Sequence, residues 1–273
     1  MRVTVLGSGS RGNAILVEAD GVRLLIDAGF SGKDLARRMA AVEVDPESVD
    51  ALLITHDHGD HTRGMGIFAR RFGTPLHLTP TTRRACQGLL RGDEKVTEYH
   101  SPSPFNLGPL LVEPFLTLHD AVDPVAVTVT DTLTGSKLGV ATDLGRPTTS
   151  VRAALAACHI LVLEANHDDA LLWNGPYPWS VKQRIASSHG HLSNRAAAEL
   201  ADELYHPDLA GVVLAHLSDS CNEPAMAHAV VESSLGARSY RGLLDVADQD
   251  EPREPIEVEA LRARLAPAQL SLL

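Results

Sequence analysis

The sequence predicts an α/β protein in which two β-sheets pack face to face and helices cover the outside. Short apolar segments with strand character alternate with helical segments along most of the chain. Strand-rich stretches occur in each half, and each is followed by helices, a pattern that favours two sheets over one. The 273 residues, 44% of them hydrophobic, supply enough apolar side chains for a core of that size.

The first half begins with three short strands and continues with helices around one buried strand. The turn "GSGSRGN" separates the first two strands, and "ADG" gives a hairpin-like signal before the third. "DALLIT" is a continuous apolar run, typical of a strand that is buried on both faces. In chain order we expect strands at 3–6, 14–18 and 22–27, a helix at 33–42, a strand at 50–55, a helix at 63–73, a strand at 75–78 and a helix at 79–91.

The second half repeats this alternation, and no internal repeat of solenoid or propeller length accompanies it. We expect strands at 110–118, 125–130 and 137–142, a helix at 150–157, a strand at 159–165, helices from about Ser180 and Ser193, a strand at 211–215 and a helix after Glu223. Residues 1–245 are therefore expected to form a single domain. Residues 246–273 begin acidic and contain prolines, so we expect an appended tail with a short helix near its end.

The composition argues against several classes of protein. A formal net charge of −11 opposes a surface that grips nucleic acid everywhere, so any binding to a polyanion must be local. Cys86, Cys158 and Cys221 are isolated in the sequence, which favours buried thiols over a disulfide framework or a cysteine zinc site. No apolar run reaches the length of a membrane span or a signal peptide. We therefore expect a soluble, cytoplasmic protein with no membrane partner.

The segment "ITHDHGDH" concentrates metal-binding side chains directly after the buried strand at 50–55. His56, His58, Asp60 and His61 supply imidazoles and a carboxylate, the ligand types that zinc takes. One ion with an open coordination position cannot use all four side chains, so the spacing favours a pair of ions. Asp57 is left over and is expected to support its neighbours or the substrate.

This spacing resembles the His-x-His-x-Asp-His signature of the metallo-β-lactamase superfamily. The resemblance implies a four-layer αββα sandwich with a dinuclear metal site at the edge between its two sheets. It also implies further ligands at later strand ends, where "FLTLHD", "GVATD" and "VVLAH" stand in order. The implied ligand sets are His56, His58 and His119 for one ion, Asp60, His61 and His216 for the other, and Asp143 as the bridge. The expected cofactors are two divalent ions, zinc or manganese, which would yield a nucleophilic water for hydrolysis, with Asp60 also counted as catalytic.

Two other histidine clusters compete with His216 for the last ligand position. "VLEANHDD" carries His167, and "SSHGHLSN" carries His189 and His191, but neither cluster directly follows a buried strand. The "HLSN" segment resembles a His-Ser-Thr stretch of ribonuclease Z relatives. That resemblance implies His191 as a general acid and Glu164 as the carboxylate that orients it, while a helix-capping role for His191 is the alternative.

Segments along most of the chain narrow the resemblance to the YycJ or WalJ branch of the superfamily. They include "GSGSRGNAILV", "LLIDAGFSGKDLARRM" and "LEANHDDALLWNGPYPWSVKQRI". The branch is associated with exonuclease action on DNA, so the resemblance implies a phosphodiesterase that acts on DNA, with a place in DNA repair. Digestion of double-stranded DNA from 5′ to 3′ is one form of this activity. A phosphodiesterase for small cyclic or short diesters and a non-catalytic, metal-stabilised binding protein are the alternatives.

Support for a nucleic-acid substrate from the residues themselves is local. The candidate substrate contacts are Arg11 in the glycine-rich turn, Asn166 and His167 after a strand, and Tyr177, Lys182 and Arg184 in "GPYPWSVKQRI". Tight-turn geometry and a loop packed on the core explain these residues equally well. Arginines at 70, 71, 83, 84 and 91 form a second basic region, which solvated helix faces also explain. Because the chain lacks room for an inserted DNA-binding domain, a DNA channel must come from its own loops or from a homodimer.

Overall fold

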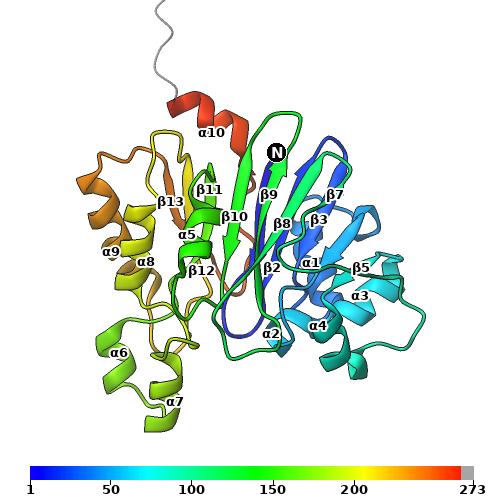
Figure 1. Ribbon diagram of the computed structural model, residues 1–273, viewed down its shortest axis with the longest axis horizontal. Coiled ribbons are helices and arrows are strands. Elements are labelled where there is room, and N and C mark those ends of the chain that lie inside the picture. The colour runs from blue at the N-terminus through cyan, green and yellow to red at the C-terminus, as the bar shows by residue number, and fades with distance from the viewer. Residues whose placement is uncertain (266–273) are drawn as a thin grey trace, which may run out of the picture.

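The computed structural model describes residues 1–265, which form two seven-stranded sheets packed face to face (Figure 1). The first sheet has the order β14-β1-β2-β3-β4-β5-β6, with strands at Ile256–Glu257, Arg2–Gly7, Ala14–Ala19, Val22–Ile26, Ala51–Leu53, Leu76–Leu78 and Val96–Glu98. The second has the order β13-β12-β11-β10-β9-β8-β7, with strands at Leu243–Val246, Gly211–Ala215, Ile160–Glu164, Lys137–Ala141, Val125–Asp131, Leu110–Leu116 and Phe105–Leu107.

Helices cover the outer face of each sheet, which confirms the predicted four-layer αββα arrangement (Figure 1). The first sheet carries α1 (Gly32–Ala41), α3 (Met65–Phe72) and α4 (Pro80–Ala85), and the second carries α5 (Thr149–Leu155), α8 (Asn194–Glu203) and α9 (Pro224–Ala237). The remaining helices are α2 (Gly59–Thr62), α6 (Asp169–Asn174), α7 (Trp179–Ile185) and α10 (Val258–Leu265), with 3-10 turns at Pro46–Ser48 and Gln87–Leu89. Within residues 1–265, no helix has both the length and the apolar composition needed to cross a lipid bilayer.

The core has three layers because most strands are buried on both faces. In β3, Leu24 and Ile26 point between the two sheets, whereas Leu25 points outward and packs with Leu35 of α1. On the far side of the second sheet, Leu161 packs under the helices that cover that sheet. This two-sided burial explains why the strands read as continuous apolar runs in the sequence.

The parallel strands bring their carboxyl ends to one edge of the sandwich. In the first sheet β3, β4, β5 and β6 are parallel, and in the second β10, β11, β12 and β13 are parallel. His56, Asp143 and His216 each follow the end of one of these strands. The backbone of Asp143 and His216 turns sharply there, with φ angles of 56° and 57°. The turns direct both side chains toward the gap between the sheets.

The expected helices and strands are present with shifted ends, and several short elements were not expected. Strands β6, β7, β13 and β14 and helix α6 had no clear periodic signal in the sequence. The expected strand at 50–55 is shorter, since only Ala51–Leu53 pairs in the sheet before the chain leaves toward His56. Cys86, Cys158 and Cys221 are free and buried, as predicted.

The segment after residue 245 packs onto the first sheet over its described part, although we expected an appended tail. Ile256 pairs with Val3 of β1 and is 8% exposed, and Val258 is fully buried in the core between the sheets. A short helix, α10, follows. The part of the expected tail at 266–273 lies outside the described residues, and the domain boundary at 245 stays a prediction.

We expect the substitution Ile256→Ala to lower the free energy of unfolding by about 2 kcal/mol, because it removes buried methyl groups from the core. The matched control Glu257→Ala changes the next residue, whose side chain is 62% exposed. This control should change the free energy of unfolding by less than about 0.5 kcal/mol. Urea unfolding followed by circular dichroism measures both. Equal effects of the two substitutions would mean that the segment does not contribute to the core.

Candidate metal centre

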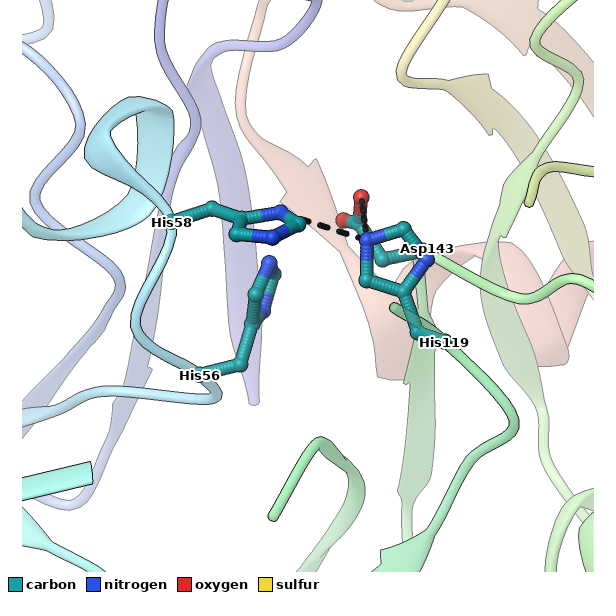
Figure 2. Close-up of side chains that lie close together, drawn as sticks. All are labelled: His56, His58, His119 and Asp143. Carbon is teal, nitrogen blue, oxygen red and sulfur yellow. Dashed lines mark hydrogen bonds and ion pairs between the residues drawn. The ribbon is translucent and has the colours of Figure 1, made fainter. Parts of the chain in front are cut away.

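One group of potential ligands gathers where β4, β8 and β10 end. His56, His58, His119 and Asp143 offer nitrogen and oxygen atoms that all lie within 4.8 Å of one another (Figure 2). The Nε2 atom of His119 lies 3.2 Å from Nδ1 of His58 and 3.4 Å from Oδ1 of Asp143. Figure 2 shows the first two histidines on the first-sheet side of this group, with the other two residues facing them from the second-sheet side.

A second group lies on the other side of Asp143. Asp60 and His61 of the short helix α2 and His216 after β12 also have donor atoms within 4.8 Å of one another. Asp143 Oδ2 lies 3.0 Å from His61 Nε2, and its Oδ1 atom lies 3.7 Å from His216 Nε2. The structure therefore brings together all seven residues of the two expected ligand sets, with the Asp143 carboxylate between them.

Hydrogen bonds fix which nitrogen of each ring faces the centre. Nδ1 of His61 donates to Asp27 Oδ2 at 2.7 Å, Nδ1 of His216 donates to Glu164 Oε1 at 2.8 Å, and Nδ1 of His119 donates to the Gly190 carbonyl at 3.0 Å. A ring that donates from Nδ1 to a fixed acceptor turns its Nε2 atom the other way. In these three rings Nε2 is therefore the nitrogen that faces the centre and could bind a metal ion.

His56 supplies the test of whether a cation fits here. Its Nδ1 atom contacts the Thr55 hydroxyl at 3.0 Å, whereas its Nε2 atom is buried without a hydrogen-bond partner among the described residues. Burial lowers the pKa of this histidine well below its ordinary value, so the ring is neutral. A buried, neutral nitrogen that lacks a donor partner would be costly unless it bound a cation. The donor set therefore fits a divalent metal ion.

The carboxylates make the electrostatic potential of the centre negative. Burial alone lowers the pKa of a histidine, but Asp143 and Asp27 outweigh it and raise the pKa of His61 well above its ordinary range. For His216, burial is likewise outweighed by nearby carboxylates, Asp143 first, and the pKa rises to about 10. A site that favours positive charge so strongly also favours divalent cations, which bring more charge than an imidazolium.

Glu164 and His191 form a pair beside the ligand groups. The last residue of β11, Glu164 is fully buried, and its Oε1 atom accepts from Nδ1 of His191 at 2.7 Å. Its Oε2 atom accepts from the amides of Leu144 and Leu192, at 2.9 and 3.0 Å. Burial raises the pKa of a carboxyl, but the charges and hydrogen bonds of the two histidines outweigh this and lower the pKa of Glu164 to about 2. Because its lone pairs are committed, Glu164 orients rings and does not ligate.

A cleft of about 240 Å³ opens beside the two groups and contains several of the expected substrate contacts. Tyr177, Arg184 and Asn166 line it, together with His191. Arg184 also pairs with Asp120 at 3.2 Å. Asn166 donates to the His216 carbonyl at 2.9 Å, so it holds the ligand loop in place as well as facing the cleft.

Three of the expected substrate contacts have other structural roles. Lys182 is 9% exposed and donates to the Trp173 carbonyl at 2.9 Å, which ties α7 to α6. His167 is buried and bridges to Ser193. Arg11 pairs with Asp219 and Asp250, each at 2.9 Å, so its charge is neutralised. All three lie outside the cleft lining, because sequence position cannot tell an inward side chain from an outward one.

Most backbone amides of the glycine-rich turn are already hydrogen-bonded within the protein. The amides of Gly9 and Arg11 donate to Asn13 Oδ1 and Gln249 Oε1, and those of Gly12 and Asn13 donate to backbone carbonyls. The turn therefore serves to place Asn13, whose Nδ2 atom lies 3.1 Å from His61 Nε2.

Sequence reasoning missed Asp27, which connects both ligand groups. Its Oδ2 atom binds His61, and its Oδ1 atom accepts from the Thr55 amide at 2.9 Å. The Thr55 hydroxyl in turn contacts both this carboxylate and His56. The signal was an aspartate at the end of a buried strand, in "LLIDAG". Asp57, the expected support, accepts from the Val122 amide at 3.0 Å and so anchors the loop that follows His119.

We expect Asp27→Asn to weaken binding of zinc or manganese by about 10- to 100-fold, because the amide no longer fixes the His61 tautomer. Titration calorimetry of the metal-free protein measures this, and circular dichroism checks that the variant folds. Asp20→Asn, the same change in an exposed turn, is the control and should bind metal like the unaltered protein. Equal affinities of the two variants would exclude a positioning role for Asp27.

Comparisons with known proteins agree with this geometry. Residues 7–146 match the family model of the metallo-beta-lactamase superfamily. The exodeoxyribonuclease YycJ of Bacillus anthracis is 31% identical over 264 residues, which cover 95% of this chain and 98% of that protein. The exodeoxyribonuclease WalJ of Streptococcus pneumoniae (strain D39) is 33% identical over 240 residues, which cover 86% of this chain and 88% of that protein.

Solved structures share the fold at lower identity. The metallo-beta-lactamase fold protein YhfI of Bacillus subtilis superposes with a TM-score of 0.72 at 19% identity, covering 92% of this chain and 98% of that chain. The short form of human tRNase Z gives a TM-score of 0.65 at 17% identity and covers 94% and 99% of the two chains. The chain therefore belongs to the metallo-beta-lactamase superfamily, in the branch that contains YycJ and WalJ, and is a metal-dependent hydrolase.

Proposed function

We propose that this hydrolase cleaves phosphodiester bonds and acts as an exonuclease on DNA. The observation that carries the proposal is the position of His191, held by the buried Glu164, in a cleft that is lined by members of both ligand groups. Phosphodiester cleavage needs electrostatic stabilisation of the phosphate and a proton donor for the leaving oxygen, and this cleft offers residues for both. The choice of DNA is supported by two relatives, each at least 31% identical, that are named exodeoxyribonucleases.

The metal centre would hold two divalent ions, zinc or manganese. His56, His58 and His119 would hold one ion, Asp60, His61 and His216 the other, and Asp143 would contact both. When bound, such ions supply Lewis acidity that polarises a phosphate oxygen and makes a water molecule more acidic. The protein contributes rings whose orientation is fixed in advance by Asp27, Glu164 and a backbone carbonyl.

His191 would act as the general acid. Its Nδ1 atom donates to Glu164, which leaves Nε2 to face the cleft, and its side chain is 12% exposed, so substrate can reach it. The buried carboxylate fixes the orientation of the ring. Protonation of the leaving 3′ or 5′ oxygen from this position would complete the cleavage of the diester.

Tyr177 and Arg184 would receive the nucleotide next to the scissile bond. Both line the cleft on the side of α7, with the aromatic ring available for stacking on a base and the guanidinium available for a phosphate. The Arg184 side chain is 61% exposed and pairs with Asp120 only at the surface, so a phosphate could replace that carboxylate at small cost.

We expect the purified protein, loaded with manganese or zinc, to shorten end-labelled linear duplex DNA and to leave covalently closed circular DNA intact. Asp60→Ala and His119→Ala should lower this activity at least about 100-fold, because each removes a metal ligand. A chelator should abolish the activity, and added metal should restore it. Denaturing gel electrophoresis measures the product lengths.

The control for those two variants is Asp20→Ala, in an exposed turn outside the cleft, which should digest DNA at the unaltered rate. Cleavage of a small chromogenic diester without digestion of DNA would favour the small-diester alternative. Absence of both activities in the metal-loaded protein would favour a non-catalytic binding protein.

We expect His191→Ala and Glu164→Gln to lower kcat on DNA by about 10²- to 10⁴-fold, because both remove the oriented proton donor. The loss should be much smaller for a p-nitrophenyl diester, whose leaving group departs without a proton. Rates measured on both substrates give the comparison. The same loss on both substrates would show that the pair supports only the structure of the site, since His216 also depends on Glu164.

A further inference from the structure

We propose that the arginine groove beside α4 binds the phosphate backbone of the duplex whose end enters the cleft. The arginine groove is the concave surface lined by Arg83, Arg84 and Arg91 with Gln87, Glu94 and Glu98, and its volume is about 610 Å³. It lies along α4 and β6, outside the metal centre, and it contains three of the arginines in the basic region of the sequence. The inference rests on the proposed function, because it assigns a second contact to the same substrate.

The arginine groove begins at the same edge of the first sheet as the metal centre. Strand β5 lies next to β4 and parallel to it, with His77 beside Leu53. Because parallel strands end at the same edge, α4 begins at Pro80 beside the segment that leads from β4 to His56. About one strand spacing, roughly 5 Å, separates the two segments. At the other end of α4, Cys86 lies against Thr62 of the metal-binding helix α2.

Ion pairs leave the arginine groove with uncompensated positive charge. Arg83 pairs with Glu98 at 2.8 Å, so these two charges cancel. Glu94 is 1% exposed and is engaged by Arg70 and by the amides of Arg91 and Gly92, so its charge is screened from the surface. The Arg84 and Arg91 guanidinium groups have no carboxylate oxygen within 4.0 Å among residues 1–265.

Two free guanidinium groups in a concave surface suit a phosphate backbone. Duplex DNA carries one charge per about 1.7 Å of its axis, and guanidinium groups bind phosphate through paired hydrogen bonds. The chain as a whole has a net charge of −11 and repels such a polyanion. Local positive charge beside the cleft is therefore what would hold the duplex, and it would position the end of the DNA for cleavage.

The test measures binding of a 30-base-pair duplex to the metal-loaded protein in a His191→Ala background, which keeps all seven proposed metal ligands and in which digestion should be at least about 100-fold slower. Fluorescence anisotropy at several salt concentrations gives Kd and its salt dependence. Arg84→Ala combined with Arg91→Ala should raise Kd about tenfold and make the slope of log K against log salt shallower by about 1.8, because two phosphate contacts are lost. Replacing both arginines by lysine should restore most of the slope, since counterion release depends on charge.

Arg241→Ala combined with Arg264→Ala is the matched control, since it removes the same charge from exposed positions. Arg241 precedes β13, at the opposite edge of the sandwich from β6, and should leave Kd and slope unchanged. If the Arg84 and Arg91 variant binds like this control while the unaltered protein digests DNA, the arginine groove is not a DNA site and the proposed function stands. If the unaltered protein neither binds nor digests DNA, both proposals fail.

Discussion

The geometry of the functional edge depends on one buried carboxylate, that of Asp143, lying between two groups of histidines. A buried carboxylate is unfavourable by several kcal/mol unless opposite charge or hydrogen bonds compensate for it. Burial alone would raise the pKa of Asp143, but the neighbouring rings, His216 and His61 first, hold it well below its ordinary value. The rings therefore keep the carboxylate ionised, and the carboxylate sets where the rings must lie. The ends of β4, β10 and β12 are fixed by this requirement.

Glu164 extends that network toward the reacting group. One carboxylate oxygen accepts hydrogen bonds from both His191 and His216, so the proposed proton donor and a proposed metal ligand are oriented by the same atom. The other oxygen is held by two backbone amides, which prevents the carboxylate from rotating. Any movement of β11 would therefore disturb both rings together. The proposed acid and the candidate metal centre are therefore coupled through the packing of the second sheet.

The ligands could be predicted from sequence because each lies close to a strand end, and strands of continuous apolar residues are easily recognised. Asp27 follows a strand too, but its role depends on Thr55 and His61, which reach it only in the folded chain. Strands β6 and β7 escaped prediction because they are partly exposed and mix polar with apolar residues, whereas the equally short β4 and β5 are fully buried. The contact of Lys182 with the Trp173 carbonyl could not be predicted either, since it is specified by how α6 meets α7. Local pattern therefore predicted which candidate ligands the fold brings together, and tertiary contacts decide which polar neighbours hold them.

Charge on this acidic chain is distributed unevenly around the cleft. On one side, Asp250 from the segment after β13 pairs with Arg11 together with Asp219, so the charge of Arg11 is neutralised. The side chain of Gln249 accepts a hydrogen bond from the backbone amide of the same arginine. That side offers little to an anion. On the other side, the only hydrogen-bond partner of the Arg84 guanidinium within residues 1–265 is the Thr81 hydroxyl, at 3.4 Å. A polyanionic substrate that enters the cleft would thus meet attraction from one direction and neutral or negative surface from the other. This uneven charge would favour one orientation of the proposed substrate in the cleft.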